Sequence, residues 1–161
     1  MITGDALNAT QVDGVVNGSD AILSTLGPKG KPHVMAAEST KNIVKAMEKH
    51  GVKRFVTVSV TGIAVPQDKR GFNLVSALIK LLLKDVFLDR ENQLAVLNSS
   101  VVEWVAVRVP RLTDEPAKGI FNAFFGDASP RMSVTRADLA DFMLGQLTGN
   151  QWVRQAPILT N

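Results

Sequence analysis

Residues 21–60, AILSTLGPKGKPHVMAAESTKNIVKAMEKHGVKRFVTVSV, decide the predicted fold because two apolar strands in them flank one amphipathic helix. The runs 21–26 and 54–60 are short and apolar, which is typical of buried strands. The helix is predicted over about 33–50, and Gly51 suits the left-handed conformation that ends many helices. Its apolar face consists of Ala36, Thr40, Ile43, Val44 and Met47. A strand, a helix and a second strand in this order predict a parallel pair with the helix crossing over it.

The same alternation continues on both sides of this unit. A first helix is predicted to open on a capping box, Thr10 followed by Asp13, and a last helix on Thr135 with Asp138. Apolar strands that alternate with helices predict one α/β domain over residues 1–161, with a parallel sheet covered on both faces. The further elements expected are helices over about 10–18, 73–88, 89–100 and 137–147 and strands at 103–109 and near 156–160.

Composition limits the class of protein. The chain of 161 residues is 45% apolar and 20% charged, which is ordinary for one globular domain. It contains no cysteine, so disulfides, thiolate metal sites and cysteine nucleophiles are excluded. The net charge of +3 comes without a run of lysine or arginine, so no nucleic-acid partner is indicated. The N-terminus lacks an apolar signal core, and Lys80 interrupts the apolar stretch 74–83, which predicts a cytoplasmic protein without a membrane span.

Three patterns that could indicate a phosphate loop, a metal site or an acid–base pair do not have the spacing that such a site requires. The glycines of GPKGKP at 27–32 lie too close together for a phosphate loop, so a turn is predicted. His33 and His50 are far apart along one helix without a carboxylate at ligand spacing, so no metal site is predicted. Asp89 and Glu91 are two residues apart and face different sides of a helix, which predicts a solvated face rather than an acid–base pair.

Candidate binding residues follow three of the predicted strands, because a ligand of such a sheet lies beyond the carboxyl ends of its strands. Glycine lets a backbone approach a ligand closely, Ser59 offers a hydroxyl, and Arg111 offers a planar cation for a phosphate or carboxylate. The structural alternatives are that Gly27 only makes a turn and that Arg111 only pairs with Asp114 or Glu115. The candidates are Leu26, Gly27 and Pro28, then Ser59, Val60 and Thr61, and finally Pro110, Arg111 and Leu112.

Four stretches of the chain resemble one protein family. They are GDALNATQVDGVVNGSDAILSTLG at 4–27, HGVKRFVTVS at 50–59, LNSSVVEWVAVRVPRLTD at 97–114 and SVTRADLADFML at 133–144. In order and in motif they resemble the atypical short-chain dehydrogenase/reductases, especially the NAD(P)H-binding, NmrA-like branch that includes the flavin and biliverdin-IXβ reductases. The resemblance implies an α/β fold with a Rossmann-like parallel sheet, helices on both faces, and NADP or NAD as the cofactor.

The resemblance also implies that part of this fold is missing. Family members have a first strand, a GxxGxxG turn, a first helix and a second strand ahead of a segment like ITGD at 2–5. The chain is therefore expected to be N-terminally truncated and to begin at the third strand. The missing turn and helix normally hold the cofactor pyrophosphate through backbone amides, so cofactor binding is expected to be weak or absent.

By the same resemblance, half of a cofactor site remains. The matching positions are Asp5 and Ala6 beside the adenine, Leu26 and Gly27 along the ribose and phosphates, Ser59, Val60 and Thr61 by the nicotinamide, and Pro110, Arg111 and Leu112 in the loop that closes over it.

The catalytic pair of the wider superfamily is absent. In that Tyr-x-x-x-Lys pair the lysine lowers the pKa of the tyrosine, and this chain contains no tyrosine. Some atypical members also lack the pair, and in them the nicotinamide transfers hydride directly while the protein orients the substrate. The resemblance therefore implies an NAD(P)H-dependent reductase that acts on a flavin-like or other small acceptor, with Ser59 as the catalytic-site residue that hydrogen-bonds the substrate. The alternatives are a noncatalytic NmrA-like sensor or protein-binding module, and an inactive truncated gene product.

The missing first strand also affects assembly. That strand would pair with 21–26, so its absence leaves an apolar edge exposed, and such edges recruit partners. The chain is expected either to rearrange its N-terminus or to form a homo-oligomer that covers this edge. The stretch 73–83 is apolar nearly all the way round a helix, for which a buried core helix or a lid over the substrate cleft is favoured over an interface.

Overall fold

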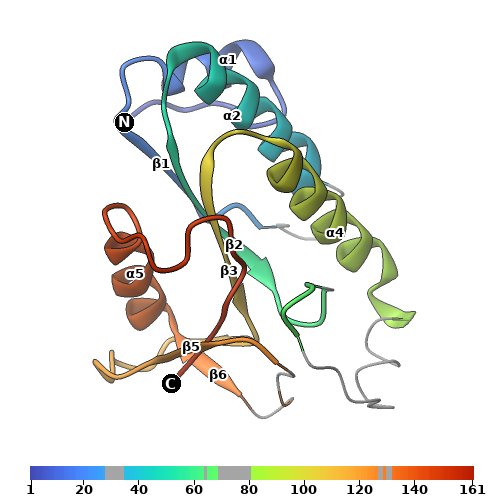
Figure 1. Ribbon diagram of the computed structural model, residues 1–161, viewed down its shortest axis with the longest axis vertical. Coiled ribbons are helices and arrows are strands. Elements are labelled where there is room, and N and C mark those ends of the chain that lie inside the picture. The colour runs from blue at the N-terminus through green and yellow to red at the C-terminus, as the bar shows by residue number, and fades with distance from the viewer. Residues whose placement is uncertain (28–34, 64, 69–80, 127–128, 130–131) are drawn as a thin grey trace.

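The computed structural model describes residues 1–27, 35–63, 65–68, 81–126, 129 and 132–161. Among these residues the main sheet has the strand order β1-β2-β3-β7-β5 (Figure 1). β1, β2, β3 and β7 run parallel, and β5 pairs antiparallel with β7. These strands are β1 (Ala21–Ser24), β2 (Arg54–Val60), β3 (Glu103–Val109), β5 (Asn122–Phe124) and β7 (Ile158–Thr160). A smaller parallel pair joins β4 (Arg111–Thr113) to β6 (Ser133–Thr135).

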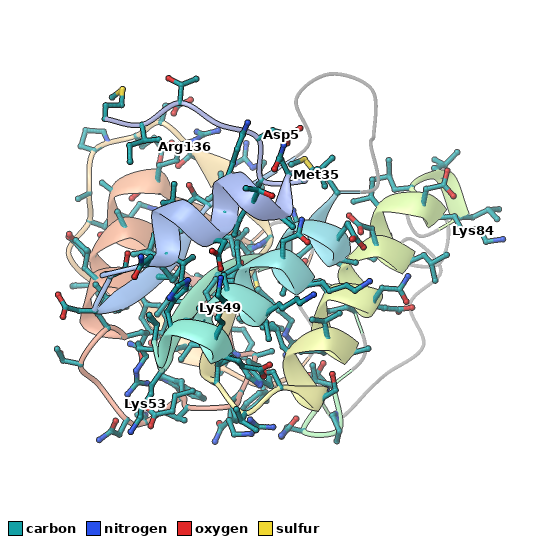
Figure 2. The ribbon with its side chains drawn as sticks, turned by 90° about the horizontal axis from the view of Figure 1, so that it is seen from above. Asp5, Met35, Lys49, Lys53, Lys84 and Arg136 are labelled. Carbon is teal, nitrogen blue, oxygen red and sulfur yellow. The ribbon has the colours of Figure 1, made fainter. Side chains whose placement is uncertain are left out.

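Helices cover both faces of the main sheet. α1 (Ala9–Val16), α2 (Ala36–His50) and α4 (Lys84–Ser99) form a row on one face, and α5 (Arg136–Gly145) lies on the other (Figures 1 and 2). Alternate side chains of a strand point to opposite faces, and both sets are buried here. The first core cluster contains Phe55, Trp104 and Ala106 with Met47 of α2 and Leu97 of α4. The second contains Val56, Val105 and Val107 with Phe142 and Met143 of α5.

The predicted α/β class with a doubly covered sheet is confirmed, but the sheet is only mostly parallel because β5 pairs antiparallel with β7. Two strands have the predicted bounds, 54–60 and 103–109. The first strand is shorter than 21–26 and ends at Ser24. Gly51 ends α2 in the left-handed conformation, with φ 72°, as predicted. Part of the predicted start of this helix lies outside the described residues.

Two helix starts differ from prediction. Asn8, not Thr10, caps α1, because its side chain accepts hydrogen bonds from the amides of Thr10 and Gln11 at 3.1 and 3.2 Å. The two stretches predicted at 73–88 and 89–100 meet without a break, since one helix runs from Lys84 to Ser99. Most of 73–83 lies outside the described residues. The cap of the last helix is confirmed, because the Thr135 hydroxyl accepts from the Asp138 amide at 3.0 Å.

The N-terminal segment does not form the expected remnant of a strand. Residues 1–8 contain no strand, and Met1 and Ile2 are exposed. β1 is an edge of the sheet in the part of the chain that the structure describes, and its Leu23 is 39% exposed. Among the described residues this edge has no strand beside it, and it is only four residues long. No helix within the described ranges combines the length and apolarity that crossing a membrane requires.

Candidate functional site

The carboxyl ends of β1, β2 and β3 meet at one edge of the sheet because the three strands are parallel. In Figure 1 all three strands run downward in the view. The register places Ser24 beside Thr57, and Ser59 and Val60 beside Arg108 and Val109. The Thr61 amide then donates to the Val109 carbonyl at 3.2 Å. The structure therefore brings together three of the predicted loop sets, those of Leu26 and Gly27, of Ser59, Val60 and Thr61, and of Pro110, Arg111 and Leu112.

These candidates differ in exposure. Ser59 is 2% exposed, whereas Val60 and Thr61 are partly exposed. Gly27 and Arg111 are exposed. Thr61 is thus the more accessible of the two hydroxyls at the end of β2. Pro28 lies outside the described residues.

The predicted adenine residues, Asp5 and Ala6, lie on the segment that leads into α1, and Asp5 is labelled in Figure 2. The Ala6 carbonyl accepts from the Asn42 side chain on α2 at 3.1 Å. The Asp5 carboxylate accepts from the Leu7 amide at 2.9 Å, and the Asp5 amide donates to Gln11 at 2.7 Å. Their described hydrogen bonds therefore fix the N-terminal segment to α1 and α2, and none goes to the three loops.

Arg90 of α4 joins the ends of the first two strands, and the sequence reasoning missed it. Its guanidinium is buried and donates to the carbonyls of Leu26 at 3.1 Å and Val58 at 3.2 Å. It also donates to the side-chain oxygen of Gln93 at 3.1 Å. The side-chain NH2 group of Gln93 then donates to the Thr57 hydroxyl at 3.3 Å. Burial lowers the pKa of Arg90, and the neighbouring Asp89 opposes that shift. Arg90 therefore ties the segment after β1 to the end of β2.

The prediction that Asp89 lies on a solvated face is wrong, because the residue is buried. Its carboxylate is buried and accepts hydrogen bonds from the amides of Met35, Ala36 and Ala37 at 3.1, 2.7 and 2.9 Å. Glu91 is exposed, as predicted. Asp89 thus caps the N-terminus of α2, whose free amides and dipole would otherwise attract an anion. The signal was present in the sequence, because Asp89 stands four residues before Gln93 and eight before Leu97, on the buried stripe of α4.

Arg108 in β3 was also missed. It is 1% exposed and forms a buried ion pair with Asp68, in the segment after β2. Its signal was a charged residue inside the apolar strand EWVAVRV, because a buried charge requires a partner.

Asp138 holds the loop that follows β4. It accepts from the amides of Lys118 and Gly119, both at 2.9 Å, and from the Thr135 hydroxyl at 2.7 Å. The side chain of Asn161 is a further donor. These hydrogen bonds, that of the Lys118 amide first, lower the pKa of Asp138. The ionised carboxylate thus ties the loop beyond Pro110, Arg111 and Leu112 to α5 and to the end of β7.

Arg111 does not pair with Asp114, because Arg136 holds that carboxylate at 2.5 Å. Within the described ranges no ion pair involves Arg111, and the residue is exposed. Those same ranges hold no group of three histidine or acidic side chains that could bind a metal ion. Among the described residues, this edge therefore presents the hydroxyls of Ser59 and Thr61, backbone groups and the exposed cation of Arg111.

Comparison with known proteins bears on this geometry. The family model described as NAD(P)H-binding matches residues 1–150. This agrees with the resemblance that the sequence motifs carry.

Solved structures show the fold. A protein described as an NAD-dependent epimerase/dehydratase, from Bacillus halodurans, superposes with a TM-score of 0.81 at 16% identity, over 99% of this chain and 72% of that one. ChuY, an anaerobillin reductase from Escherichia coli O157:H7, gives 0.75 at 18% identity, over 98% and 73%. A short-chain dehydrogenase/reductase from Veillonella parvula, in complex with NADP, gives 0.73 at 17% identity, over 99% and 71%. The Rossmann-like α/β fold is confirmed.

Proposed function

This chain belongs to the NAD(P)H-binding family, and from that premise we propose that it is an NAD(P)H-dependent reductase. The acceptor is a flavin-like or other small conjugated molecule that takes hydride directly from the nicotinamide. The observation that carries the proposal is the meeting of the loops after β1, β2 and β3 at one edge of a parallel sheet. In sheets of this kind that edge is where a dinucleotide binds.

Each loop has a part in the proposed site. Gly27 presents its backbone, without a side chain, to the ribose and phosphates. A Cβ at this position would meet no atom within 4 Å, so packing within the protein does not explain the glycine. The free guanidinium of Arg111 neutralises a phosphate or an acidic acceptor. Ser59 hydrogen-bonds the acceptor, and Thr61 beside it is the more exposed hydroxyl. Asp5 and Ala6 are proposed to lie beside the adenine, which the resemblance alone supports.

The side chains suit the nicotinamide end of the cofactor better than its pyrophosphate. Asp89 occupies the amides that begin α2, so that helix end is not free to hold a phosphate. When bound, the cofactor supplies the hydride, and the residues of this chain orient the ring and the acceptor and exclude water. Weak NADP or NAD binding is the expected result.

A titration with NADPH and NADH, followed by nicotinamide fluorescence together with the oligomeric mass, tests the proposal. Saturable binding in the micromolar range and cofactor oxidation with a flavin acceptor support it. Arg111→Gln is expected to weaken binding, whereas the matched control Arg136→Gln, whose guanidinium already holds Asp114, is not. Absence of binding at millimolar cofactor contradicts the proposal.

The missing tyrosine favours a second candidate, a noncatalytic dinucleotide sensor. The sensor shares the binding step but not turnover, so the same titration followed by an acceptor screen separates the two. Saturable binding with no cofactor oxidation by any flavin or linear tetrapyrrole would favour the sensor. A Ser59→Ala variant adds to this test, because it slows turnover only if the protein is a reductase that uses this hydroxyl.

A further inference from the structure

The buried ion pair of Arg108 and Asp68 stands beside the proposed site without being part of it. The two guanidinium nitrogens Nη1 and Nη2 contact the two carboxylate oxygens at 2.6 and 2.8 Å, and the Asp68 side chain is 4% exposed. Arg108 Nε donates to the Ala156 carbonyl at 2.7 Å. This is a bidentate, desolvated arrangement, which fixes direction as well as distance.

The pair connects segments that are far apart in sequence. Asp68 ends the described part of the loop after β2, which is 40 residues from Arg108. Its carboxylate also accepts from the Gly126 amide at 3.0 Å, and Gly126 has φ 144°. Arg108 thereby ties β3 and the segment before β7 to the loop after β2, and Asp68 extends the link to the segment after β5.

The loop held in this way is the one that begins with the proposed nicotinamide residues. Ser59 is the register partner of Arg108, so the two side chains share one face of the sheet. The Ile63 side chain is fully buried in the first core cluster, which anchors the middle of the loop. Thr61 is anchored by its amide, and Asp68 is anchored by the guanidinium. Three anchors therefore fix the described residues of this loop, 61–63 and 65–68.

Stability alone is a poor reason for such a pair. Taking both charges out of water costs about as much as their attraction returns, and apolar residues of similar volume often stabilise a core equally well. What an apolar pair cannot do is specify one orientation of the loop, because apolar contacts are not directional.

We propose that the Arg108–Asp68 pair is a positioning device that holds the end of β2, with Ser59, and the loop that begins at Thr61 in register with the nicotinamide. This inference rests on the proposed reductase function. In this proposal Arg108 and Asp68 do not contact the cofactor or the acceptor. They act by holding the loop after β2. A displaced loop would still bind cofactor through the other two loops but would place the acceptor badly for hydride transfer.

Asp68→Asn tests the proposal, because asparagine keeps the shape and removes the charge. We expect kcat for cofactor oxidation to fall about 10- to 100-fold, as misplacement of reacting groups does, while the Kd of NADPH changes less than about 3-fold. Hydrogen exchange at the Thr61 and Gly126 amides is expected to rise about 10-fold or more, since these amides report local opening. The matched control Asp114→Asn breaks an exposed ion pair near the same end of the sheet and should change none of these quantities.

Arg108→Lys keeps the charge but loses the two-pronged contact, and it serves if Asp68→Asn does not fold. Partial retention of kcat and of Thr61 protection in this variant supports a positioning role. A lower unfolding midpoint with unchanged kcat, KM and Thr61 exchange would overturn it and leave only a structural ion pair. If the wild-type chain binds no NADPH, the reductase proposal fails, and the exchange measurement alone still decides whether the pair positions the loop.

Discussion

Asp89→Ala is expected to lower the free energy of unfolding by about 3 kcal/mol, because the carboxylate is the cap of a helix in a different part of the sequence. It accepts three amide hydrogen bonds at the start of α2, across 52 to 54 residues of chain. Loss of an N-cap costs about 1 kcal/mol, with a range of roughly 0.5–2. A buried negative charge at a helix N-terminus adds up to about 2 kcal/mol. Together these terms give the expected loss.

Asp89→Asn separates the two terms. Asparagine still offers one acceptor oxygen but carries no charge, so about half of the loss is expected. Both variants also leave the buried guanidinium of Arg90 without the negative charge beside it. Since the stability of a domain this size is about 5–15 kcal/mol, either loss is readily measured.

Urea unfolding followed by far-ultraviolet circular dichroism measures these losses, and hydrogen exchange at the Ala36 and Ala37 amides locates them. Glu91→Ala is the matched control, because Glu91 is exposed two residues along the same helix and should change stability by less than about 0.5 kcal/mol. The reasoning is refuted if Asp89→Ala falls within about 0.5 kcal/mol of Glu91→Ala. It is also refuted if protection of the Ala36 and Ala37 amides is unchanged.

Three further predictions follow from single residues. Hydrogen bonds to Asp138 lower its pKa below the usual 3.8, so the ionised carboxylate stabilises the fold at pH values above 3.8. The difference in unfolding free energy between wild type and Asp138→Asn should therefore shrink as the pH falls below 3.8. Urea unfolding between neutral pH and pH about 2 measures this difference. Gly51→Ala should lower the free energy of unfolding by about 1–2 kcal/mol, because Gly51 has φ 72°, even though an added Cβ would meet no atom. Gly145→Ala, at the end of α5, should leave that free energy unchanged or raise it. We propose that a second copy of the chain covers the open edge of β1, so Leu23→Lys should reduce self-association measured by sedimentation.

Each of these has a contrary result. A stability difference for Asp138→Asn that grows on acidification would place its folded pKa above the unfolded one. Equal effects of alanine at Gly51 and Gly145 would mean that the left-handed turn is not a constraint. A wild-type chain that sediments as a monomer at every concentration would remove the need for a partner at β1.

The candidate site was predictable to the extent that it consists of positions just after strands. Because the strand bounds 54–60 and 103–109 are right, the apolar pattern alone predicts that Ser59, Thr61 and Arg111 lie at the carboxyl ends of β2 and β3, whereas their part in binding stays a prediction. The contacts that hold those loops in place were not predicted. Arg90, Arg108 and Asp138 act on backbone groups or charges of other segments, and a pattern of neighbours in sequence carries no information about which segment that is.

Local periodicity by itself determined the α/β class, the strands β2 and β3, and the left-handed end of α2 at Gly51, because side-chain spacing and glycine's backbone freedom act within a few residues. The tertiary structure decided the roles of the buried charges. Asp89 is read as solvated from its neighbours and becomes a helix cap only when α4 packs on α2. Arg108 finds Asp68 only when the chain folds back over 40 residues. The role of a buried charge depends on the partner that offsets its lost hydration, and tertiary packing determines which group that partner is.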